Sequence, residues 1–392
     1  MATSGSSKHT IIFSRKCLSL VNEKEQEELN KAIGFLLSKP DQFNVYFTSH
    51  KSPSDEMLSA IPKGMHKSFI PRGDAQKFIE ETSSNGEVVI ICGAVDVDLY
   101  LAANTKSFLI AAGWVTPEEK VVQYGIPAPT PTKMRALIEI IVNQTNWYYL
   151  CAFDDPVPTK VVSLCLSNTY TVSPEEKAMA EAFKAILKYG ADNPAIKQAL
   201  ICYLMAAIAH DKDFKEVEDW AVTPSSSTNP SQIMKDLKER VRCMMNGRKS
   251  EPIFIRHTAT GKSRFDSRED RQRDDYCLKH FRSIRVNDKY KGKLKGRVVC
   301  VFDDYLNHGN TFEALRNLLI KCKVKKIIFV SIGKFKRNYE SQYVQKSFSI
   351  EGDVYSENYT AEFNTVAQHK VTFDNAARRS LENLEQLAIL LR

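Results

Sequence analysis

Apolar runs with the length of strands alternate with amphipathic segments through the first third of the chain. The strand-like ranges are 9–13, 43–47, 87–92 and 107–111. The ranges with apolar residues at helical spacing are 23–37, 74–81 and 98–104. Strands separated by helices are typical of a parallel sheet with helices on its faces. This part of the chain is therefore predicted to be an α/β domain.

The strongest signal for a domain boundary lies near the middle of the chain. Strand-like runs at 147–151 and 161–166 suggest a hairpin, and Asp154 and Asp155, beside a proline, are typical of its turn rather than of a metal site. Ser173, followed by a proline, predicts the start of a helix. We place the boundary at 168–172, which gives a disordered tail at 1–8, a first domain at 9–168 and a second domain at 172–392.

The second domain is predicted to be α/β as well, so we expect two domains, each a mainly parallel sheet flanked by helices. It opens with two apolar-rich helices, 173–189 and 193–210, and the apolar stripe of the second is typical of a core or a dimer interface. The chain ends on an amphipathic helix at 374–391, capped by Asp374. This last helix should dock onto the body of the protein, onto a protein partner or onto a second copy of the chain.

The segment with the clearest chemical meaning begins at Val298. Five apolar residues are followed by Asp303 and Asp304, then by a polar loop with one glycine and a helical pattern at 312–320. Carboxylates can accept hydrogen bonds from two ribose hydroxyls, while loop N–H groups and a helix N-terminus hold a phosphate. Ligands of open α/β sheets bind at this end of the strands. The pattern predicts a sugar-phosphate site, and the alternative is an ordinary strand-to-helix turn. The residues expected to form the site are Asp303, Asp304, Asn307, His308, Gly309, Asn310 and Thr311.

The same segment resembles the diphosphate-sugar motif of the type I phosphoribosyltransferases. That motif is an apolar run, paired acids and a Thr-Gly-x-Thr loop, and the matching positions are Asp303, Asp304, Gly309 and Thr311. His308 departs from the pattern, because the family has a small hydroxyl residue before the glycine. An imidazole there narrows the phosphate cradle or adds a donor to it. The resemblance implies that Asp303 and Asp304 hold the ribose hydroxyls and, through them, Mg²⁺.

Two upstream segments extend the resemblance over about 210 to 345. Ser225, Ser226 and Ser227 follow a strand-like run and would hold the leaving diphosphate, although a flexible serine linker is an equal alternative. The segment 253–271 resembles the mobile loop of the competence-protein-F-like branch. Guanidinium groups bind phosphate oxygens in pairs, so the residues expected to close over the diphosphate are Lys262, Arg264, Arg268 and Arg271.

The first domain resembles a degenerate member of the haloacid-dehalogenase-like phosphatases. Three places carry the resemblance: a strand before Ser14, a strand ending at Thr48, and a strand followed by Asp96 and Asp98. The family needs a carboxylate nucleophile and a second carboxylate at its first motif. Ser14 and Lys16 occupy those positions, so we do not expect phosphatase activity. The domain is interpreted as a scaffold or binding module, with a generic doubly wound domain as the alternative.

Composition narrows the class of protein. No apolar run reaches the roughly 18 residues that span a bilayer, and the nine cysteines are scattered singly, as buried thiols in a reducing compartment would be. A soluble, cytoplasmic protein is therefore expected.

The net charge is +8, and the range 321–337 carries seven basic residues and no acid. That range can attract nucleic acid, but a solvated helix end beside a phosphate site explains it better.

Two functions of different classes follow. The first is an enzyme of the phosphoribosyltransferase type that binds 5-phosphoribosyl 1-diphosphate or a related nucleotide sugar phosphate and transfers or hydrolyses at the glycosidic bond. The second is a catalytically weakened, nucleotide-sensing effector or regulatory partner protein. The pairing of a degenerate phosphatase-like domain with a phosphoribosyltransferase-like domain resembles accessory proteins of bacterial phage-defence loci, retron-associated ones among them.

Overall fold

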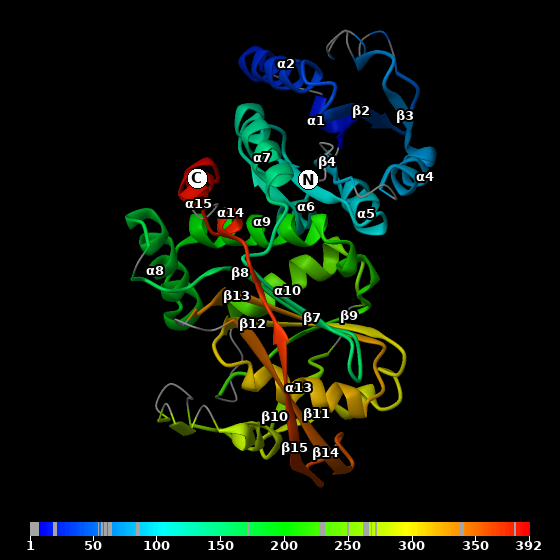
Figure 1. Ribbon diagram of the computed structural model, residues 1–392. Helices are drawn as coiled ribbons and strands as arrows, with labels where there is room; N and C mark the ends of the chain where they lie inside the picture. Colours follow the sequence, from blue (N-terminus) through cyan, green and yellow to red (C-terminus); the bar gives the residue numbers. More distant parts are fainter. Residues whose placement is uncertain are drawn as a thin grey trace.

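Two β-sheets organise the chain. The computed structural model describes residues 8–392 except 19–21, 54, 56–57, 59–60, 62–64, 84–86, 171, 227–231, 249–250, 262–265, 268, 271–272, 337–340 and 380–381. The predicted tail at 1–8 therefore lies outside the described residues, apart from Lys8. Figure 1 shows the first sheet and its helices at one end of the molecule and the second sheet at the other.

The first sheet, sheet A, has six parallel strands. Its strands are β1 (His9–Ser14), β2 (Phe43–Ser49), β3 (Phe69–Pro71), β4 (Val89–Gly93), β5 (Phe108–Ala112) and β6 (Ile126–Ala128), in the spatial order β3-β2-β1-β4-β5-β6. Its helices are α1 (Arg15–Leu18), α2 (Glu23–Leu37), α4 (Arg72–Ser83), α5 (Asp96–Asn104), α6 (Glu119–Tyr124) and α7 (Pro131–Asn143). This confirms the parallel α/β arrangement predicted for the first half of the chain.

The second sheet, sheet B, is mixed. Its strands are β7 (Tyr149–Phe153), β8 (Thr159–Leu166), β9 (Asp219–Val222), β12 (Val298–Leu306), β13 (Lys326–Lys334) and β16 (Thr372–Phe373), in the order β16-β7-β8-β13-β12-β9. The four strands β8, β13, β12 and β9 run parallel, whereas β7 and β16 are antiparallel to their neighbours. The carboxyl ends of the parallel strands form one edge of the sheet, where the predicted site lies.

The change from one sheet to the other comes earlier in the chain than the predicted boundary at 168–172. β7 and β8, assigned from the sequence to the first domain, belong to sheet B, because β8 pairs with β13 from Thr159↔Ile327 to Leu166↔Lys334. The two strands do form the predicted hairpin, with Asp154 and Asp155 exposed in its turn. The switch between sheets therefore falls between α7 and β7. The pairing partner of β8 is distant in sequence, so no local pattern reveals it.

Helix α9 (Pro194–His210) joins the two sheets. Almost every one of its side chains from Ala195 to Ala209 is buried, and it packs against α7, α8 (Pro174–Tyr189), α10 (Gln232–Met244) and α15 (Glu382–Leu390). Figure 1 shows α9 between the sheets. Its apolar residues therefore form core, one of the two roles predicted for them.

The last helical segment docks onto the body of the protein. Asp374 caps it as predicted, since its carboxylate accepts the backbone N–H groups of Ala376 and Ala377 at 2.7 and 3.1 Å. The described helical segments that follow are α14 (Asn375–Arg379) and α15, and residues 380 and 381 between them lie outside the described residues. Leu384 and Leu387 of α15 are fully buried against α8 and α9.

Smaller elements complete the second half of the chain. A long antiparallel hairpin is formed by β14 (Gln342–Gly352) and β15 (Tyr359–Lys370), and a separate two-stranded antiparallel sheet by β10 (Phe254–Arg256) and β11 (Ile284–Val286). The other helices that the structure describes are α12 (Leu278–Phe281) and α13 (Asn310–Lys321), with 3-10 turns η2 (Lys212–Glu216), η4 (Asp274–Cys277) and η5 (Asp288–Tyr290). Among the described residues, no helix is long and apolar enough to cross a membrane.

Candidate functional site

The acid pair lies near the carboxyl end of a central strand of sheet B. β12 continues to Leu306, so Asp303 and Asp304 lie inside the strand rather than after it. The strand is longer than predicted because its pairing with β13 extends to Leu306↔Lys334. On the other side, the N–H of Thr223 donates to the carbonyl of Phe302 at 2.8 Å, which brings the end of β9 beside the acids.

The two carboxylates have different surroundings. Asp303 accepts a hydrogen bond from the backbone N–H of Asp304 at 2.8 Å and another from the side chain of Thr223. Burial, and then the neighbouring charge of Asp304, raise the pKa of the Asp303 carboxyl to about 7. Asp304 accepts the N–H of Tyr305 at 2.7 Å and forms an ion pair with Lys188. The raised pKa makes the Asp303 carboxyl easier to protonate near neutral pH than an ordinary aspartate.

Lys188 is a site residue that the sequence did not reveal. It lies in the last turn of α8, and its Nζ contacts Oδ2 of Asp304 while lying 5.4 Å from the centre of the Tyr305 ring. That geometry combines an ion pair with a cation–π contact. The only local signal was the position of a lysine at a helix end, which is common on any surface helix.

The glycine loop connects β12 to α13 in the way the motif predicts. Gly309 is the N-cap of α13 with φ +77°, and it has no side chain that could accept hydrogen bonds from the first turn. Asn307 and His308 are half-buried, whereas Asn310 is buried and Thr311 half-buried at the start of the helix. The buried Lys334 donates to the carbonyl of Asn307 at 2.9 Å. A helix N-terminus next to a lysine is favourable for a phosphate.

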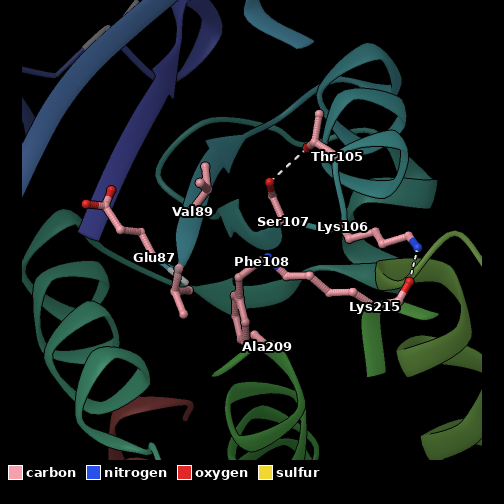
Figure 2. Close-up of a pocket in the computed structure, with 9 residues that line it drawn as sticks. Glu87, Val89, Thr105, Lys106, Ser107, Phe108, Ala209 and Lys215 are labelled. Carbon is pink, nitrogen blue, oxygen red and sulfur yellow. Dashed lines mark hydrogen bonds between the residues drawn. The ribbon is translucent and has the colours of Figure 1, made fainter. Parts of the chain in front are cut away.

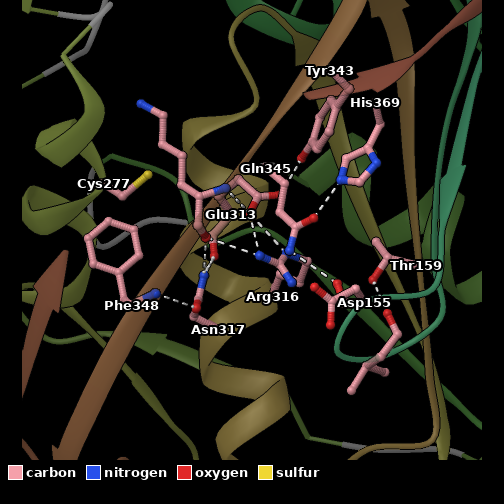
Figure 3. Close-up of polar contacts among 12 residues, drawn as sticks. Asp155, Thr159, Cys277, Glu313, Arg316, Asn317, Tyr343, Gln345, Phe348 and His369 are labelled. Atoms are coloured by element: carbon pink, nitrogen blue, oxygen red, sulfur yellow. Dashed lines mark hydrogen bonds and ion pairs between the residues drawn. The ribbon is translucent and has the colours of Figure 1, made fainter. Parts of the chain in front are cut away.

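A buried polar network contacts α13 on the side of β14 (Figure 3). Glu313, fully buried, accepts Arg316 Nε at 2.9 Å, the Tyr343 hydroxyl at 2.7 Å and the backbone N–H of Lys346 at 2.9 Å. The side chain of Asn317 bonds the carbonyl of Lys346 at 2.8 Å. The network ties the first turns of α13 to β14. Because Arg316 neutralises Glu313, the carboxylate does not oppose an anion bound at the helix N-terminus.

The serine loop lies beside the acid pair and is held by Arg256. This buried arginine of β10 donates Nε to the carbonyl of Ser225 and Nη2 to that of Pro224 at 3.3 Å, while the N–H of Thr260 donates to the carbonyl of Ser226 at 3.1 Å. Ser225 and Ser226 are thus placed at the predicted edge. The remaining predicted residues of this region lie outside the described residues, namely Ser227, Lys262, Arg264, Arg268 and Arg271.

The acid pair is a poor match for the Mg²⁺ ion that the resemblance implies. The described residues contain no group of three or more His, Cys, Asp or Glu side chains able to hold a metal ion. Of the two carboxylates, Asp304 already contacts the Lys188 ammonium. A divalent cation that reached Asp304, directly or through ribose hydroxyls, would lie close to that positive charge and be repelled.

The residues that resemble phosphatase motifs have structural partners instead. Asp98 is fully buried, accepts the backbone N–H groups of Ala94 and Val95 at 2.9 and 3.2 Å, and pairs with Arg72. Asp96 pairs with Lys120 at 3.1 Å. Ser14 and Thr48 do lie side by side at the ends of β1 and β2. At this edge of sheet A, the retained acid Asp98 is therefore paired with Arg72.

The described part of the basic range, 321–336, does not form one continuous surface, and Arg337 lies outside the described residues. Lys326 begins β13 and pairs with Asp213 at 2.8 Å, whereas Lys334 ends the same strand and is buried at the sugar-phosphate edge. The two lysines are the first and last of the nine residues of this strand, about 26 Å apart. At the end of α9, His210 and Asp211 have structural partners: His210 Nε2 lies 2.9 Å from the Ile141 carbonyl, and Asp211 contacts Lys160 at 2.6 Å.

A small cavity lies between sheet A and α9, away from the acid pair (Figure 2). Glu87, Ser107 and Phe108 line it together with two lysines, Lys106 and Lys215. Its volume is about 10 Å³, room for a single water molecule. It is too small for a sugar phosphate.

Comparison with protein-family models, with curated proteins and with solved structures finds no match for the chain. The assignment of the site therefore rests on its own geometry.

Proposed function

We propose that the carboxyl edge of sheet B binds a ribose that carries a 5-phosphate, in 5-phosphoribosyl 1-diphosphate or a related nucleotide sugar phosphate. One observation carries the proposal: the acid pair of β12, the Gly309 loop after it and the serine loop after β9 lie on adjacent parallel strands. This arrangement supports a phosphoribosyltransferase-like fold for the second half of the chain. The parallel sheet A, with Ser14 and Thr48 side by side at its edge, supports a degenerate haloacid-dehalogenase-like fold for the first half.

Each motif has a role in the proposed complex. Asp303 and Asp304 bind the two ribose hydroxyls, and the raised pKa of Asp303 lets it donate as well as accept a hydrogen bond. The backbone of 307–311 and the N-terminus of α13 hold the 5-phosphate. Ser225 and Ser226 hold the diphosphate, and Lys262, Arg264 and Arg271 are proposed to close over it.

Transfer of the phosphoribosyl group is the proposed reaction. Departure of diphosphate leaves positive charge on the sugar, so the site contributes positioning and stabilises the charge of the leaving group. With a nucleotide bound and water as the acceptor, the same chemistry attacks the anomeric carbon, cleaves the N-glycosidic bond and releases the base. The nine free cysteines support a reducing, cytoplasmic compartment for the protein.

A nucleotide-sensing effector is the second candidate. Two observations favour it: Lys188 occupies one carboxylate of the acid pair, and Arg72 occupies the retained acid of sheet A. In that case the carboxyl edges of sheets A and B bind ligands, or present them to a protein partner, with reduced catalytic activity. Action in a bacterial phage-defence system of the retron type rests on the two-domain architecture alone.

Calorimetric titration with 5-phosphoribosyl 1-diphosphate tests the proposal. We expect micromolar binding by the wild type and a loss of about a hundredfold in Asp303→Asn/Asp304→Asn, because two charge-assisted hydrogen bonds are removed. The matched control is Asp154→Asn/Asp155→Asn, an exposed acid pair in the β7–β8 turn, which should bind like the wild type. Wild-type protein that shows no heat of binding, or a double variant that binds equally well, would overturn the proposal and direct attention to NAD or ATP.

If the ligand binds, release of diphosphate on addition of bases or nucleotides separates the two candidates. Release in the wild type and not in the double variant supports transfer, whereas binding without release supports the effector.

A further inference from the structure

The acid pair already has a cation next to it. Nζ of Lys188 contacts Oδ2 of Asp304, and the Lys188 side chain is 40% exposed while that of Asp304 is 18% exposed. The Lys188 side chain is thus anchored at Asp304 and still reaches solvent. A lysine ammonium has three N–H donors, so the contact with Asp304 leaves donors that can turn toward a bound ligand.

The fold fixes this lysine against the acids. The two residues before it, Ile186 and Leu187, are buried in the core and set the rotation of α8. The helix ends directly after it, with Gly190 at φ +67° and its N–H bonded to the carbonyl of Ala185. A cation in the last turn is also favoured by the helix dipole. The contact therefore follows from the packing of α8 and does not depend on a flexible loop.

We propose that Lys188 takes the place of a divalent cation, so that the site binds its phosphoribosyl ligand without Mg²⁺. This inference rests on the proposed function. The ammonium bridges Asp304 and the anionic oxygens of the ligand, and the face of Tyr305, 5.4 Å from Nζ, supports the charge. A magnesium ion at the same carboxylate would be repelled by the ammonium.

The test is calorimetry with 5-phosphoribosyl 1-diphosphate in excess chelator and again in millimolar MgCl₂. We expect the wild type to bind with the same affinity in both. Lys188→Gln should lose about tenfold to a hundredfold in affinity in chelator, because a charge-assisted contact is removed, and should regain most of it when Mg²⁺ is added. Lys177→Gln, an exposed lysine on the same helix and about 16 Å away along its axis, is the matched control and should behave as the wild type.

A second readout uses the protein without ligand. Titration with MgCl₂ alone should give no heat with the wild type and measurable binding with Lys188→Gln. Wild-type binding that requires Mg²⁺ would overturn the inference. A Lys188→Gln variant that binds as well as the wild type in chelator would overturn it too, and tighter binding by the variant would show that the lysine blocks the ligand site. Absence of ligand binding by every variant under both conditions would instead overturn the proposed function, and this inference with it.

Discussion

Gly309 is the single residue on which the shape of the phosphate loop depends most. Its φ of +77° lies in the left-handed region, which costs a residue with a side chain about 1–2 kcal/mol. A Cβ atom added there would also lie 2.9 Å from a ring carbon of Tyr343. Backbone conformation and the close approach of the tyrosine both require glycine.

Gly309→Ala should lower the free energy of unfolding by at least about 1–2 kcal/mol and weaken binding of the sugar phosphate. Denaturation in urea and calorimetry measure the two effects. Gly34→Ala is the matched control, since Gly34 lies within α2 with no atom near its missing side chain. It should raise the free energy of unfolding by about 0.5–1 kcal/mol. A Gly309→Ala protein as stable as the wild type would contradict the account of the loop.

At the scale of secondary structure, α13 is held to the β14–β15 hairpin by the buried pair Glu313 and Arg316. Arg316 donates Nη2 to the carbonyl of Lys346 at 3.0 Å as well as Nε to Glu313, and both side chains are fully buried. A buried pair is not in itself strongly stabilising, but removal of one partner leaves an uncompensated charge.

Arg316→Leu should therefore lower the free energy of unfolding by about 3–5 kcal/mol, because Glu313 would stay buried without its cation. Urea denaturation measures the loss. Glu251→Gln breaks an exposed ion pair with Lys289 and should leave stability unchanged. Equal stability of the two variants would show that the network does not hold the helix.

Elements with a regular apolar pattern could be predicted from the sequence, and elements defined by distant partners could not. Helix α2 has buried residues at Leu29, Ile33 and Leu36 and spans the predicted 23–37. Most of β15 is exposed, although Tyr359, Ala361 and Phe363 at its start alternate with exposed polar residues. The hairpin was not predicted, because β15 buries too few side chains to give a strong apolar pattern.

The candidate site divides in the same way. Asp303, Asp304 and Gly309 stand in one short motif, so the sequence was sufficient to find them. Lys188 and Arg256 reach the site from helices and strands far away in the chain, and nothing in their local sequence indicates it.

At the scale of the whole molecule, the junction between the sheets contains two facing histidines. The rings of His9, at the start of β1, and His210, at the end of α9, lie 5.6 Å apart at 83°. Burial, and then the proximity of His210, lower the pKa of His9 to about 4. Burial also lowers the pKa of His210. Both rings are therefore neutral in the folded protein at neutral pH.

Stability should fall as the pH is lowered from about 6.5 toward 4. In that range the unfolded chain binds a proton at His9 that the folded chain does not, which favours unfolding. The contribution of His9 is about 2 kcal/mol near pH 5. Urea denaturation of the wild type and His9→Gln at about pH 7.5 and pH 5 measures it. The variant should lose less stability on acidification, and an equal loss in both proteins would show that His9 does not contribute.

A crystal structure of the protein with 5-phosphoribosyl 1-diphosphate would locate the ligand directly. We expect the ribose hydroxyls within hydrogen-bond distance of Asp303 and Asp304, and the 5-phosphate against the backbone of 307–311. Ligand density at the edge of sheet A, or on any surface away from β12, would contradict this expectation.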